Sequence, residues 1–480
     1  MAYKLLKTGH APLRRPGLLT AAAVGASLLG GCYSYKPPPE AISGETYTAL
    51  TEKAKAALPD ESGQLSLEKT REIALANNPG YLATKHSMAA ATARFYQSLS
   101  AYLPTITATY NQTENKYTPE SRGGIGRDNG GHKWDQKTAL ITGRWRIFNG
   151  LMRTMNMLAA LHEKRGEEAL NRDARRLLLK AVTIAYNNVL LARENIRIVK
   201  ADEVFNAQLR DEAKLKFDAG AVPLSDVLNF EIRVNNARTA LIAEEYNFFT
   251  ARSVLAELMG FTNGIVPEDV FPPLKPSADN FSLNVGVYLD TALRNRPDLK
   301  AFRETVEAAK YNVYSRWGAF APTLDVFGSW GYQRDADGYY GNFQYRPRTQ
   351  DRSFSYGFEA QWVLFSGGER IANLREAQAV LAQRKELLTE KWIGVVAEVR
   401  QAYADLKRRL EQVVIYKETL AYVKKNRSLV EESYKAGNTS ITRLNEAQRD
   451  LVTADSDYVR AVIDLENSKA NLAAAIGVDN

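Results

Sequence analysis

The residue types that usually carry catalysis or metal binding are sparse in this sequence. It has 480 residues with a single cysteine and four histidines. His132 and His162 have no partner at the spacing of a metal-binding motif. The glycine run at 123–126 lacks the lysine of a phosphate-binding loop and suits a hairpin loop, and no Gly-x-Ser-x-Gly sequence is present. The sequence therefore predicts no catalytic residue, no metal site and no enzyme.

The residue with an evident covalent chemistry is Cys32. It follows a charge-free apolar stretch, residues 17–31, which is shorter than the ~20 residues that a spanning helix needs. Basic residues without any acidic one precede this stretch: Lys4, Lys7, Arg14 and Arg15. This order is typical of an export signal. The Leu-Gly-Gly before Cys32 resembles the lipobox of bacterial lipoproteins, whose cysteine is acylated and becomes the mature N-terminus. The alternative is an ordinary export signal with a cysteine there by chance.

Tyr33, not an aspartate, follows the cysteine, and by the same resemblance this favours the outer membrane. Residues 1–31 would then be a lipoprotein signal peptide and residues 32–64 an N-terminal spacer. Loss of the signal removes four of 63 basic residues and none of the 55 acidic ones, so the net charge falls from +8 to +4. With basic and acidic residues so nearly balanced, the sequence shows no cluster of basic residues dense enough to bind nucleic acid. A helical membrane transporter is also excluded, because no other stretch is long and apolar enough.

The rest of the chain contains an internal sequence repeat. Landmarks recur at a distance of 217 or 218 residues: Pro79 and Pro297, Pro104 and Pro322, Phe148 and Phe365, Gly220 and Gly437, Gly260 and Gly477. Five intervals kept in register predict a duplicated structural unit. We place the first repeat at residues 65–262, a linker at 263–280 and the second repeat at 281–480.

Each repeat changes its hydrophobic period in the same order. A proline begins a helix, and alternation of period two then predicts hairpins at 104–149 and 322–366. A helical pattern follows at 151–259 and 368–476. The apolar strand positions are Ile106, Ala108, Tyr110, Ile141, Trp145 and Ile147, then Leu324, Val326, Trp330, Tyr332, Phe354, Tyr356, Phe358, Ala360, Trp362 and Leu364. The order predicted for each repeat is helix, β-hairpin, long helix, helix.

The long helix of the first repeat carries two apolar seams, each with the spacing of a coiled coil. One contains Leu177, Ala181, Ile184, Asn188, Leu191, Asn195 and Ile198, and the other contains Val182, Ala185, Val189, Ala192, Ile196 and Val199. A helix with two seams has a neighbour on each side, as in the wall of a tube. A helix inside an ordinary bundle is the alternative.

The doubled order of elements resembles the TolC family, also called outer membrane efflux proteins, in its lipidated branch. The resemblance covers roughly residues 65–480. It rests on the Leu-Pro-Thr entry into the first strand, the Phe-x-Gly exit from each hairpin and the glycine turn that ends each long helix. It implies a mixed α and β membrane protein. Three chains would form one tube, a 12-stranded β-barrel in the outer membrane on a long coiled-coil α-barrel in the periplasm.

The strand pattern agrees with this on physical grounds. Open sheet edges cannot lie in lipid, so a sheet that spans a membrane must close on itself. Four strands are too few to close a barrel, whereas the twelve strands of three copies are enough. The apolar strand faces suit lipid, and the polar faces suit a wet lumen. A soluble β-layer is the alternative for these strands.

The resemblance also implies a function: a passive exit duct of a tripartite efflux or type I secretion system. The duct would be lipid-anchored in the outer membrane, with a helical part in the periplasm. Its partners would be further copies of itself, a periplasmic adaptor, an inner-membrane pump and outer-membrane lipid. No cofactor is expected apart from the lipid on Cys32. The alternative is a lipid-anchored periplasmic coiled-coil protein that supports an envelope complex; such a scaffold would not need the four strands.

By the resemblance, the turns after the long helices lie at the periplasmic tip and meet the adaptor. Their residues are Gly220, Ala221, Val222 and Pro223 in the first repeat and Gly437, Asn438, Thr439 and Ser440 in the second. The alternative role of both glycines is simple helix termination.

The family closes its tip with a polar network and an acidic constriction. Asp226 matches the acidic network residue and Tyr434 its tyrosine partner, whereas Thr439 replaces the family's arginine. Of the two acidic positions that follow, Arg443 reverses one charge and Glu446 retains the other. The alternatives are a helix N-cap for Asp226 and a surface ion pair for Arg443 and Glu446.

Overall fold

The computed structural model describes residues 48–50, 52, 64–117, 132–268, 270–273, 284–339 and 349–478. It divides into two units, Met1–Thr51 and Glu52–Asn480. In the first unit only residues 48–50 are described, and they are helical. Cys32, the expected signal peptide and most of the expected spacer therefore lie outside the described residues, as does the glycine run at 123–126. Everything below concerns the second unit.

The elements of the second unit occur in two matching series. The first consists of α3 (Leu67–Asn77), α4 (Pro79–Ser100), β1 (Thr105–Tyr117), β2 (His132–Asn149), α5 (Met152–Asp218) and α6 (Leu224–Leu258). The second consists of α7 (Val285–Asn295), α8 (Pro297–Gly318), β3 (Thr323–Tyr339), β4 (Thr349–Gln361), α9 (Glu369–Lys435) and α10 (Ile441–Ile476). The two long helices, α5 and α9, have 67 residues each. Proline occupies the first turn of both α4 and α8, where its missing N–H costs no hydrogen bond.

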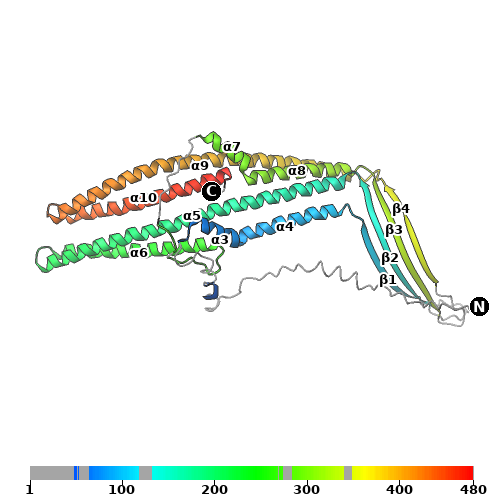
Figure 1. Cartoon of the computed structure of the whole chain (residues 1–480), viewed down its shortest axis with the longest axis horizontal. Helices are drawn as coiled ribbons and strands as arrows, with labels where there is room; N and C mark the ends of the chain where they lie inside the picture. The colour runs from blue at the N-terminus through cyan, green and yellow to red at the C-terminus, as the bar shows by residue number, and fades with distance from the viewer. Residues whose placement is uncertain are drawn as a thin grey trace, which may run out of the picture. The chain divides into compact units, whose positions relative to one another are not determined.

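The four strands form one antiparallel sheet in the order β1-β2-β3-β4 (Figure 1). The two hairpins have equivalent registers, since Thr105 lies opposite Arg144 in the first and Thr323 opposite Gln361 in the second. Strands β2 and β3 join the hairpins, with an irregularity between Arg146 and Phe148. The outer edges of β1 and β4 have no strand partner among the described residues of the chain.

The end of β4 differs from the sequence expectation. The alternating pattern continues to Leu364, but the strand ends at Gln361. Its partner β3 begins at Thr323, directly opposite Gln361, so residues 362–366 have no strand beside them. The equivalent end of β2 continues to Asn149 because β3 pairs with it. A neighbouring strand, and not the local sequence, decides where these two strands end.

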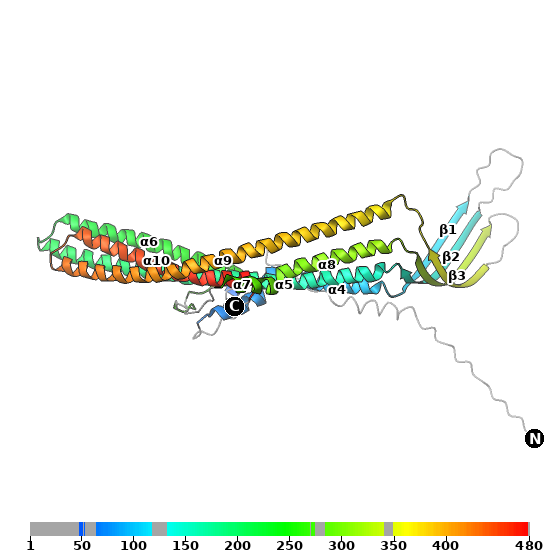
Figure 2. The same ribbon diagram turned by 90° about the horizontal axis from the view of Figure 1, so that it is seen from above.

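The helices lie side by side in a fixed order. Towards the glycine turns the order is α9, α10, α5 and α6, and towards the sheet it is α9, α8, α5 and α4 (Figures 1 and 2). Helices α5 and α9 each run the whole distance, whereas the shorter helices fill half of it. Helix α5 is therefore flanked on both sides and α9 on one side only.

The burial of α5 follows its two predicted seams unequally. Val182 and Val189, from the second seam, are fully buried, and Ala185 and Ala192 are buried with them in the largest core cluster. In the first seam Leu177 and Asn188 remain exposed, whereas Ile198 is buried. Within one chain, therefore, the second seam is the packed one.

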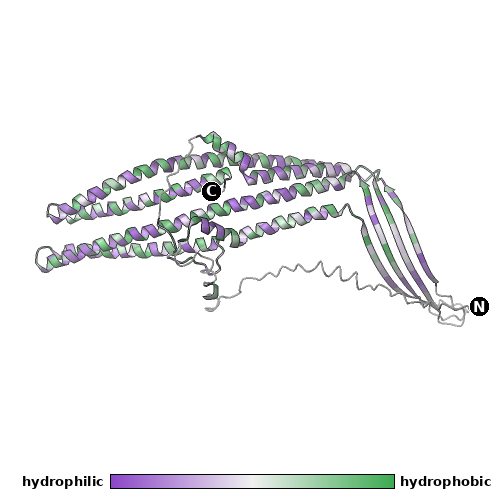
Figure 3. Ribbon diagram, in the orientation of Figure 1, coloured by the Kyte–Doolittle hydropathy of each residue, from purple (hydrophilic) through white to green (hydrophobic). Residues whose placement is uncertain are grey.

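Hydrophilic and hydrophobic residues are interspersed along the helices (Figure 3). Over the residues that the structure describes, no helix combines the length and the apolar character needed to cross a membrane.

The last helix of each series ends in the same way, at a glycine with positive φ. Gly260 and Gly477 both have positive φ, 72° and 75°, and they pack against the ends of α3 and α7, just before the proline helices. A Cβ on Gly260 would lie 2.5 Å from the carbonyl oxygen of Asn77, so only glycine fits there. Asn78 donates to the carbonyl oxygen of Leu258 at 2.9 Å, and Arg296 donates to that of Ala475 at 3.1 Å. These bonds satisfy carbonyl groups that a helix end leaves free.

Candidate functional site: the helical tips and the sheet junction

The two turns at the far end of the helices have the same geometry. Gly220 and Gly437 have φ angles of 74° and 76°. The backbone N–H of Ala221 donates to the carbonyl of Lys216 at 2.8 Å, and that of Asn438 donates to Ser433 at 2.9 Å. This is the Schellman ending of a helix. No atom lies within 4 Å of a Cβ built on either glycine, so the left-handed backbone alone requires them.

The expected adaptor contacts are accessible in the single chain. Val222 and Thr439 are half-buried, and the other expected contacts are exposed: Gly220, Ala221, Pro223, Gly437, Asn438 and Ser440. Ser440 is also the N-cap of α10, and its hydroxyl accepts the N–H of Arg443 at 3.4 Å. The two turns are thus accessible and lie at well-defined helix ends; the first carries small apolar side chains and the second carries polar ones.

An apolar cluster behind the turns holds the four tip helices together. Phe230 of α6 and Leu444 of α10 are fully buried in it, and Leu209 and Ala213 of α5 are buried beside them. Tyr434 of α9 packs against this group. The structure thus brings Asp226 and Tyr434, which are 208 residues apart in sequence, to the same end of the helices.

Asp226 does not cap its helix. The N-cap of α6 is Pro223, and Asp226 lies in the first turn after it. The N-cap interpretation of Asp226 is therefore wrong. A carboxylate in the first turn still interacts favourably with the positive end of the helix dipole.

Among the described hydrogen bonds, none joins Asp226 to Tyr434. Burial raises the pKa of the Tyr434 phenol, and the negative charges of Asp226 and Glu212 raise it further. Lys216 lies over the ring, with its Nζ 5.7 Å from the ring centre. The charge of Asp226 therefore reaches Tyr434 without a direct bond in the single chain.

Arg443 and Glu446 lie on the exposed side of α10. Their side chains form an ion pair with 3.5 Å between Nη1 and Oε2, one helical turn apart. In the single chain the two charges therefore neutralise each other as a solvent-exposed pair. Such pairs contribute little to stability.

A set of polar side chains that the sequence did not reveal links the two helical pairs behind the tip. Gln448 of α10 donates to Asp202 of α5 at 2.7 Å and accepts from Arg427 of α9 at 3.2 Å. Asn445 of α10 donates to Asn229 of α6 at 3.3 Å. We name Asp202, Asn229, Arg427, Asn445 and Gln448 the polar brace.

The polar brace is partly buried. Asn445 and Gln448 are among the buried polar residues, and burial raises the pKa of Asp202 although the Gln448 hydrogen bond opposes this. Arg427 also lies over the ring of Phe205, 4.2 Å from its centre. The partners are too far apart in sequence for spacing to predict them. The available signal was the occurrence of Asn445 and Gln448 at adjacent seam positions.

At the opposite end, each hairpin is fastened to its preceding helix in the same way. The indole N–H of Trp145 donates to the carbonyl of Tyr102 at 2.9 Å, and that of Trp362 donates to Phe320 at 3.1 Å. An arginine that follows each hairpin, Arg153 or Arg370, donates to the adjacent carbonyl of Ala101 or Ala319. These two tryptophans therefore anchor the sheet to the helices, a role that the sequence pattern did not indicate.

Charged side chains gather on the polar face of the sheet beside this junction. Arg146 donates to both oxygens of Asp325, at 2.8 and 3.1 Å. Arg144 bridges Asp325 and Glu359, at 3.3 and 3.0 Å. Asp325 is buried between the two arginines. Strands β2, β3 and β4 are thus joined by ion pairs as well as by backbone hydrogen bonds.

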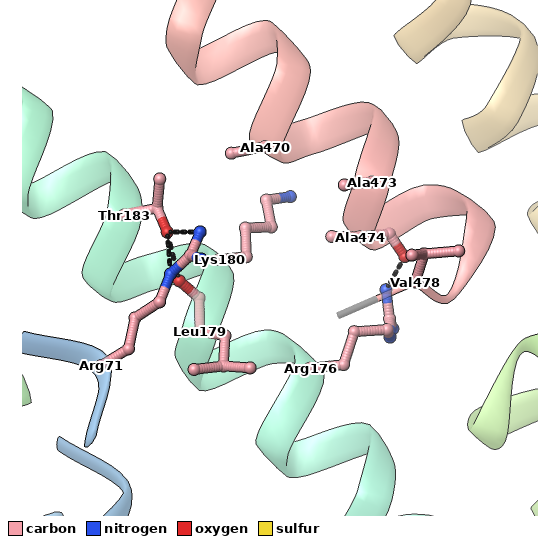
Figure 4. A pocket seen from close by; sticks show the side chains of 9 residues that line it. All are labelled: Arg71, Arg176, Leu179, Lys180, Thr183, Ala470, Ala473, Ala474 and Val478. Carbon is pink, nitrogen blue, oxygen red and sulfur yellow. Dashed lines mark hydrogen bonds between the residues drawn. The ribbon is translucent and has the colours of Figure 1, made fainter. Parts of the chain in front are cut away.

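A small hollow between α3, α5 and α10 is lined by basic side chains (Figure 4). Arg71 donates to the hydroxyl of Thr183 at 2.8 Å, and Arg176 donates to the carbonyl of Ala474. Arg176 also pairs with Asp173. Because these arginines are engaged within the chain, the hollow is better understood as a junction between helices than as a binding site.

Comparison with known proteins agrees with this architecture. The family model described as outer membrane efflux protein matches residues 70–261 and 288–478, which lie in the two series of elements. The alkaline protease secretion protein AprF of Pseudomonas aeruginosa is 22% identical over 432 residues, covering 88% of this chain and 86% of AprF. The outer membrane protein TolC of Vibrio cholerae is 21% identical over 432 residues, covering 87% and 94% respectively.

Among solved structures, the CmeC outer membrane channel of Campylobacter jejuni has a similar fold. Its TM-score is 0.74 at 17% identity, over 93% of this chain and 90% of CmeC. The family model covers most of both series, and the relatives align over nearly the whole chain. The chain therefore belongs to the outer membrane efflux protein family, and it is an outer-membrane channel protein and not an enzyme.

Proposed function

We propose that three copies of this chain form a passive exit duct through the outer membrane. Their sheets would close into a 12-stranded barrel and their helices into a tube that extends into the periplasm. The observation that carries this proposal is the four-stranded sheet, which has an exposed apolar face and two edges without a strand partner among the described residues. A family of outer-membrane channels provides the context in which such a sheet is stable.

The exposure of the sheet supports this arrangement. Phe354 and Tyr356 of β4 are 71% and 80% exposed, and Ile106 of β1 is 76% exposed. Transfer of aromatic and aliphatic side chains into lipid or its interface is favourable, whereas exposure of such a surface to water would promote aggregation. Unpaired strand edges cannot remain open in lipid, so copies of the same sheet are the natural partners.

The edges of the helical layer support the same assembly. On one edge α9 exposes Val414, Ile415 and Tyr422, and on the other α6 exposes Ile232, Ile242 and Tyr246. The two edges are different surfaces, so contact between them is head-to-tail and produces a ring when the rotation closes. The sheet places β4 at the edge with α9 and β1 at the edge with α4 and α6 (Figure 1).

We further propose how the duct is connected to its energy source and how its periplasmic end is closed. The exposed turns at Gly220 and Gly437 would bind a periplasmic adaptor, which connects the duct to an inner-membrane pump that provides the energy. When three tips converge, Asp226 of one helical pair would accept the hydroxyl of Tyr434 from another and hold the end closed. Glu446 would favour cations in the opened bore and Arg443 would oppose it. The cargo would be a drug, another solute, a metal ion or a polypeptide; the names of two relatives mention protease secretion and efflux.

We also propose that Cys32 is acylated after removal of residues 1–31, so that lipid anchors the mature N-terminus. Mass spectrometry of the membrane-extracted protein tests this: a lipid-modified N-terminal Cys32 is expected. An unmodified N-terminus at another residue would contradict it.

Conductance in planar bilayers tests the duct itself. The purified protein should produce discrete channel openings that are small while the tip is closed. Protein that is folded and correctly extracted from the membrane but never conducts, even with the tip substitutions described below, would favour the alternative of a lipid-anchored periplasmic coiled-coil scaffold. The four strands speak against that alternative, because a scaffold does not need a sheet with an exposed apolar face.

A further inference from the structure

The internal duplication provides a template for how one copy meets the next. Within the chain, the second strand of the first hairpin pairs with the first strand of the second hairpin, β2 with β3. In a closed ring the next such junction joins β4 to β1 of a neighbouring copy. This inference rests on the proposed function, because it assumes that copies close the sheet.

The two hairpins are equivalent residue by residue. Thr105 and Thr323 lie opposite Arg144 and Gln361, and each threonine hydroxyl donates to the carbonyl of its partner, at 3.2 and 3.5 Å. The tryptophan and arginine bonds at the junction also recur at matching positions. Positions in β1 and β3 therefore correspond at a distance of 218 residues, and positions in β2 and β4 at a distance of 217.

We infer that the copy-to-copy register is the internal β2–β3 register carried over by these two distances. In the chain, Arg144 lies opposite Phe327, and Trp145 lies opposite Val326. The corresponding pairs are Gln361 opposite Thr109 of the next copy and Trp362 opposite Ala108 of the next copy.

The face of each side chain provides an independent check. In the inferred register Gln361 and Thr109 both belong to the polar face, and Trp362 and Ala108 both belong to the apolar face. A slip of one residue would turn every side chain to the wrong face. Only registers shifted by two residues or more in either direction compete with the inferred one.

The register also explains two features that the single chain leaves open. Residues 362–366 are not a strand, although their counterparts at the end of β2 are, because their expected partner lies in another copy. Gly150 packs so closely on Gly318 that a Cβ would lie 2.1 Å from its carbonyl oxygen, whereas its counterpart Gly367 has no atom within 4 Å of its Cβ position. The counterpart of Gly318 is Ser100, so Gly367 would lie near Ser100 of the next copy. A Cβ on Gly318 would lie 2.4 Å from the carbonyl oxygen of Gly150, so Ser100, which has a Cβ, would approach Gly367 less closely than Gly318 approaches Gly150.

The two junctions would differ in one respect. The internal junction contains the ion pair between Arg146 and Asp325, which lie opposite each other. Their counterparts in the copy-to-copy junction are Val363 and Thr107, which cannot form an ion pair. At this position, therefore, the internal junction has an ion pair between side chains and the copy-to-copy junction would have none.

Disulfide cross-linking tests the register. Directly opposed residues in antiparallel strands have Cβ atoms ~4.5–5.5 Å apart, whereas those two residues out of register are ~7–8 Å apart at the Cα atoms. Disulfides need Cβ atoms ~3.5–4.5 Å apart, so they favour the opposed pair. The test variant combines Gln361→Cys with Thr109→Cys. The competing variants combine Gln361→Cys with Thr107→Cys or with Asn111→Cys, which lie on the same face.

Mild oxidation of outer-membrane preparations, followed by electrophoresis without reductant, should give dimers and trimers for the 361–109 pair. The two shifted pairs should give at least about fivefold less. The variant with Gln361→Cys alone controls for other thiols. Thr142→Cys with Ser329→Cys, which lie opposite each other within the chain, controls for access of the oxidant and should form a bond without any change in copy number.

The outcomes separate the register from the assembly. Stronger cross-linking of a shifted pair would overturn the inferred register and leave the closed ring intact. No cross-link between copies from any of the three pairs, with the internal control oxidised, would show that β4 and β1 do not meet, and the proposed ring would fail with the inference.

Discussion

Helices α5 and α9 have the same length and the same place in their repeats, yet their burial differs sharply. Helix α5 has buried residues along most of its length, including Val182 and Val189, which are fully buried. The buried residues of α9 are few: Leu374, Val395, Val399, Leu406 and Leu420. Helix α5 is flanked on both sides, by α4 and α6 and by α8 and α10, whereas α9 lies beside α8 and α10 and also contacts the short helix α7.

The duplicated sequence gives the two helices the same length and place in their repeats. Their burial differs because they occupy different positions in the helical layer. The order of elements places the first long helix inside the layer and the second at its edge. The exposed apolar residues of α9 therefore have no cover among the described residues of the chain. In the proposed ring, the edge of the next copy provides it.

The largest effect is expected inside α5. Val189→Asp would bury a charge inside the largest apolar cluster of the described residues, which costs several kcal/mol and can unfold a marginally stable protein. We expect loss of folded protein, measured by yield and by resistance to protease. Ile184→Asp, on the half-buried seam, is the matched comparison and should leave the chain folded while it weakens the trimer on native gels. Normal yield and an intact trimer for Val189→Asp would contradict the packing of α5.

The next effect is expected at the edge formed by α9. Val414→Asp combined with Ile415→Asp changes side chains that are exposed in the single chain, so the fold should survive. If another copy covers this edge, the trimer should dissociate at lower temperature on native gels. Lys425→Asp, on the same helix, is the control for added negative charge and should have a smaller effect. Trimers as heat-resistant as the wild type would show that this part of α9 faces solvent.

A third prediction concerns the tips of the helices. Asp226→Ala with Tyr434→Phe removes a proposed charge-assisted hydrogen bond, which contributes ~1.5–3 kcal/mol when shielded from water. Single-channel conductance should rise while the barrel remains folded. Each single substitution should give most of the increase, because either one breaks the bond. Unchanged closed-state conductance would show that other residues form the constriction.

The helices and strands were predictable because the local signals for them occur in both repeats. Prolines at the helix starts, period-two strands and glycines with positive φ are local signals, and they recur at Pro79 and Pro297 or Gly220 and Gly437. The end of β4 at Gln361 was not predictable, because it depends on a neighbouring strand. The Asp202–Gln448 bond was not predictable either, since it joins residues that only the packing of α5 on α10 brings together.

The smallest effect is expected from the polar brace. Burial raises the pKa of Asp202, so the folded chain holds its proton more tightly than the unfolded chain does. Its contribution to stability therefore falls as the pH rises through the folded-state pKa. Asp202→Asn should remove this loss and still accept the Gln448 hydrogen bond. The melting temperature of the variant should exceed that of the wild type at pH 7, and the difference should shrink towards pH 4. A variant that is less stable at pH 7 would mean that the charged carboxylate stabilises the brace.

In the proposed assembly, neighbouring copies cover the edge of α9 and the edges of the sheet, which one chain leaves exposed. Native mass spectrometry of the detergent-extracted protein measures the number of copies directly. We expect a complex of three chains that remains intact at low protein concentration. A monomer, or a complex of any other number, would contradict it, because the unpaired edges of β1 and β4 would then have to be covered in some other way.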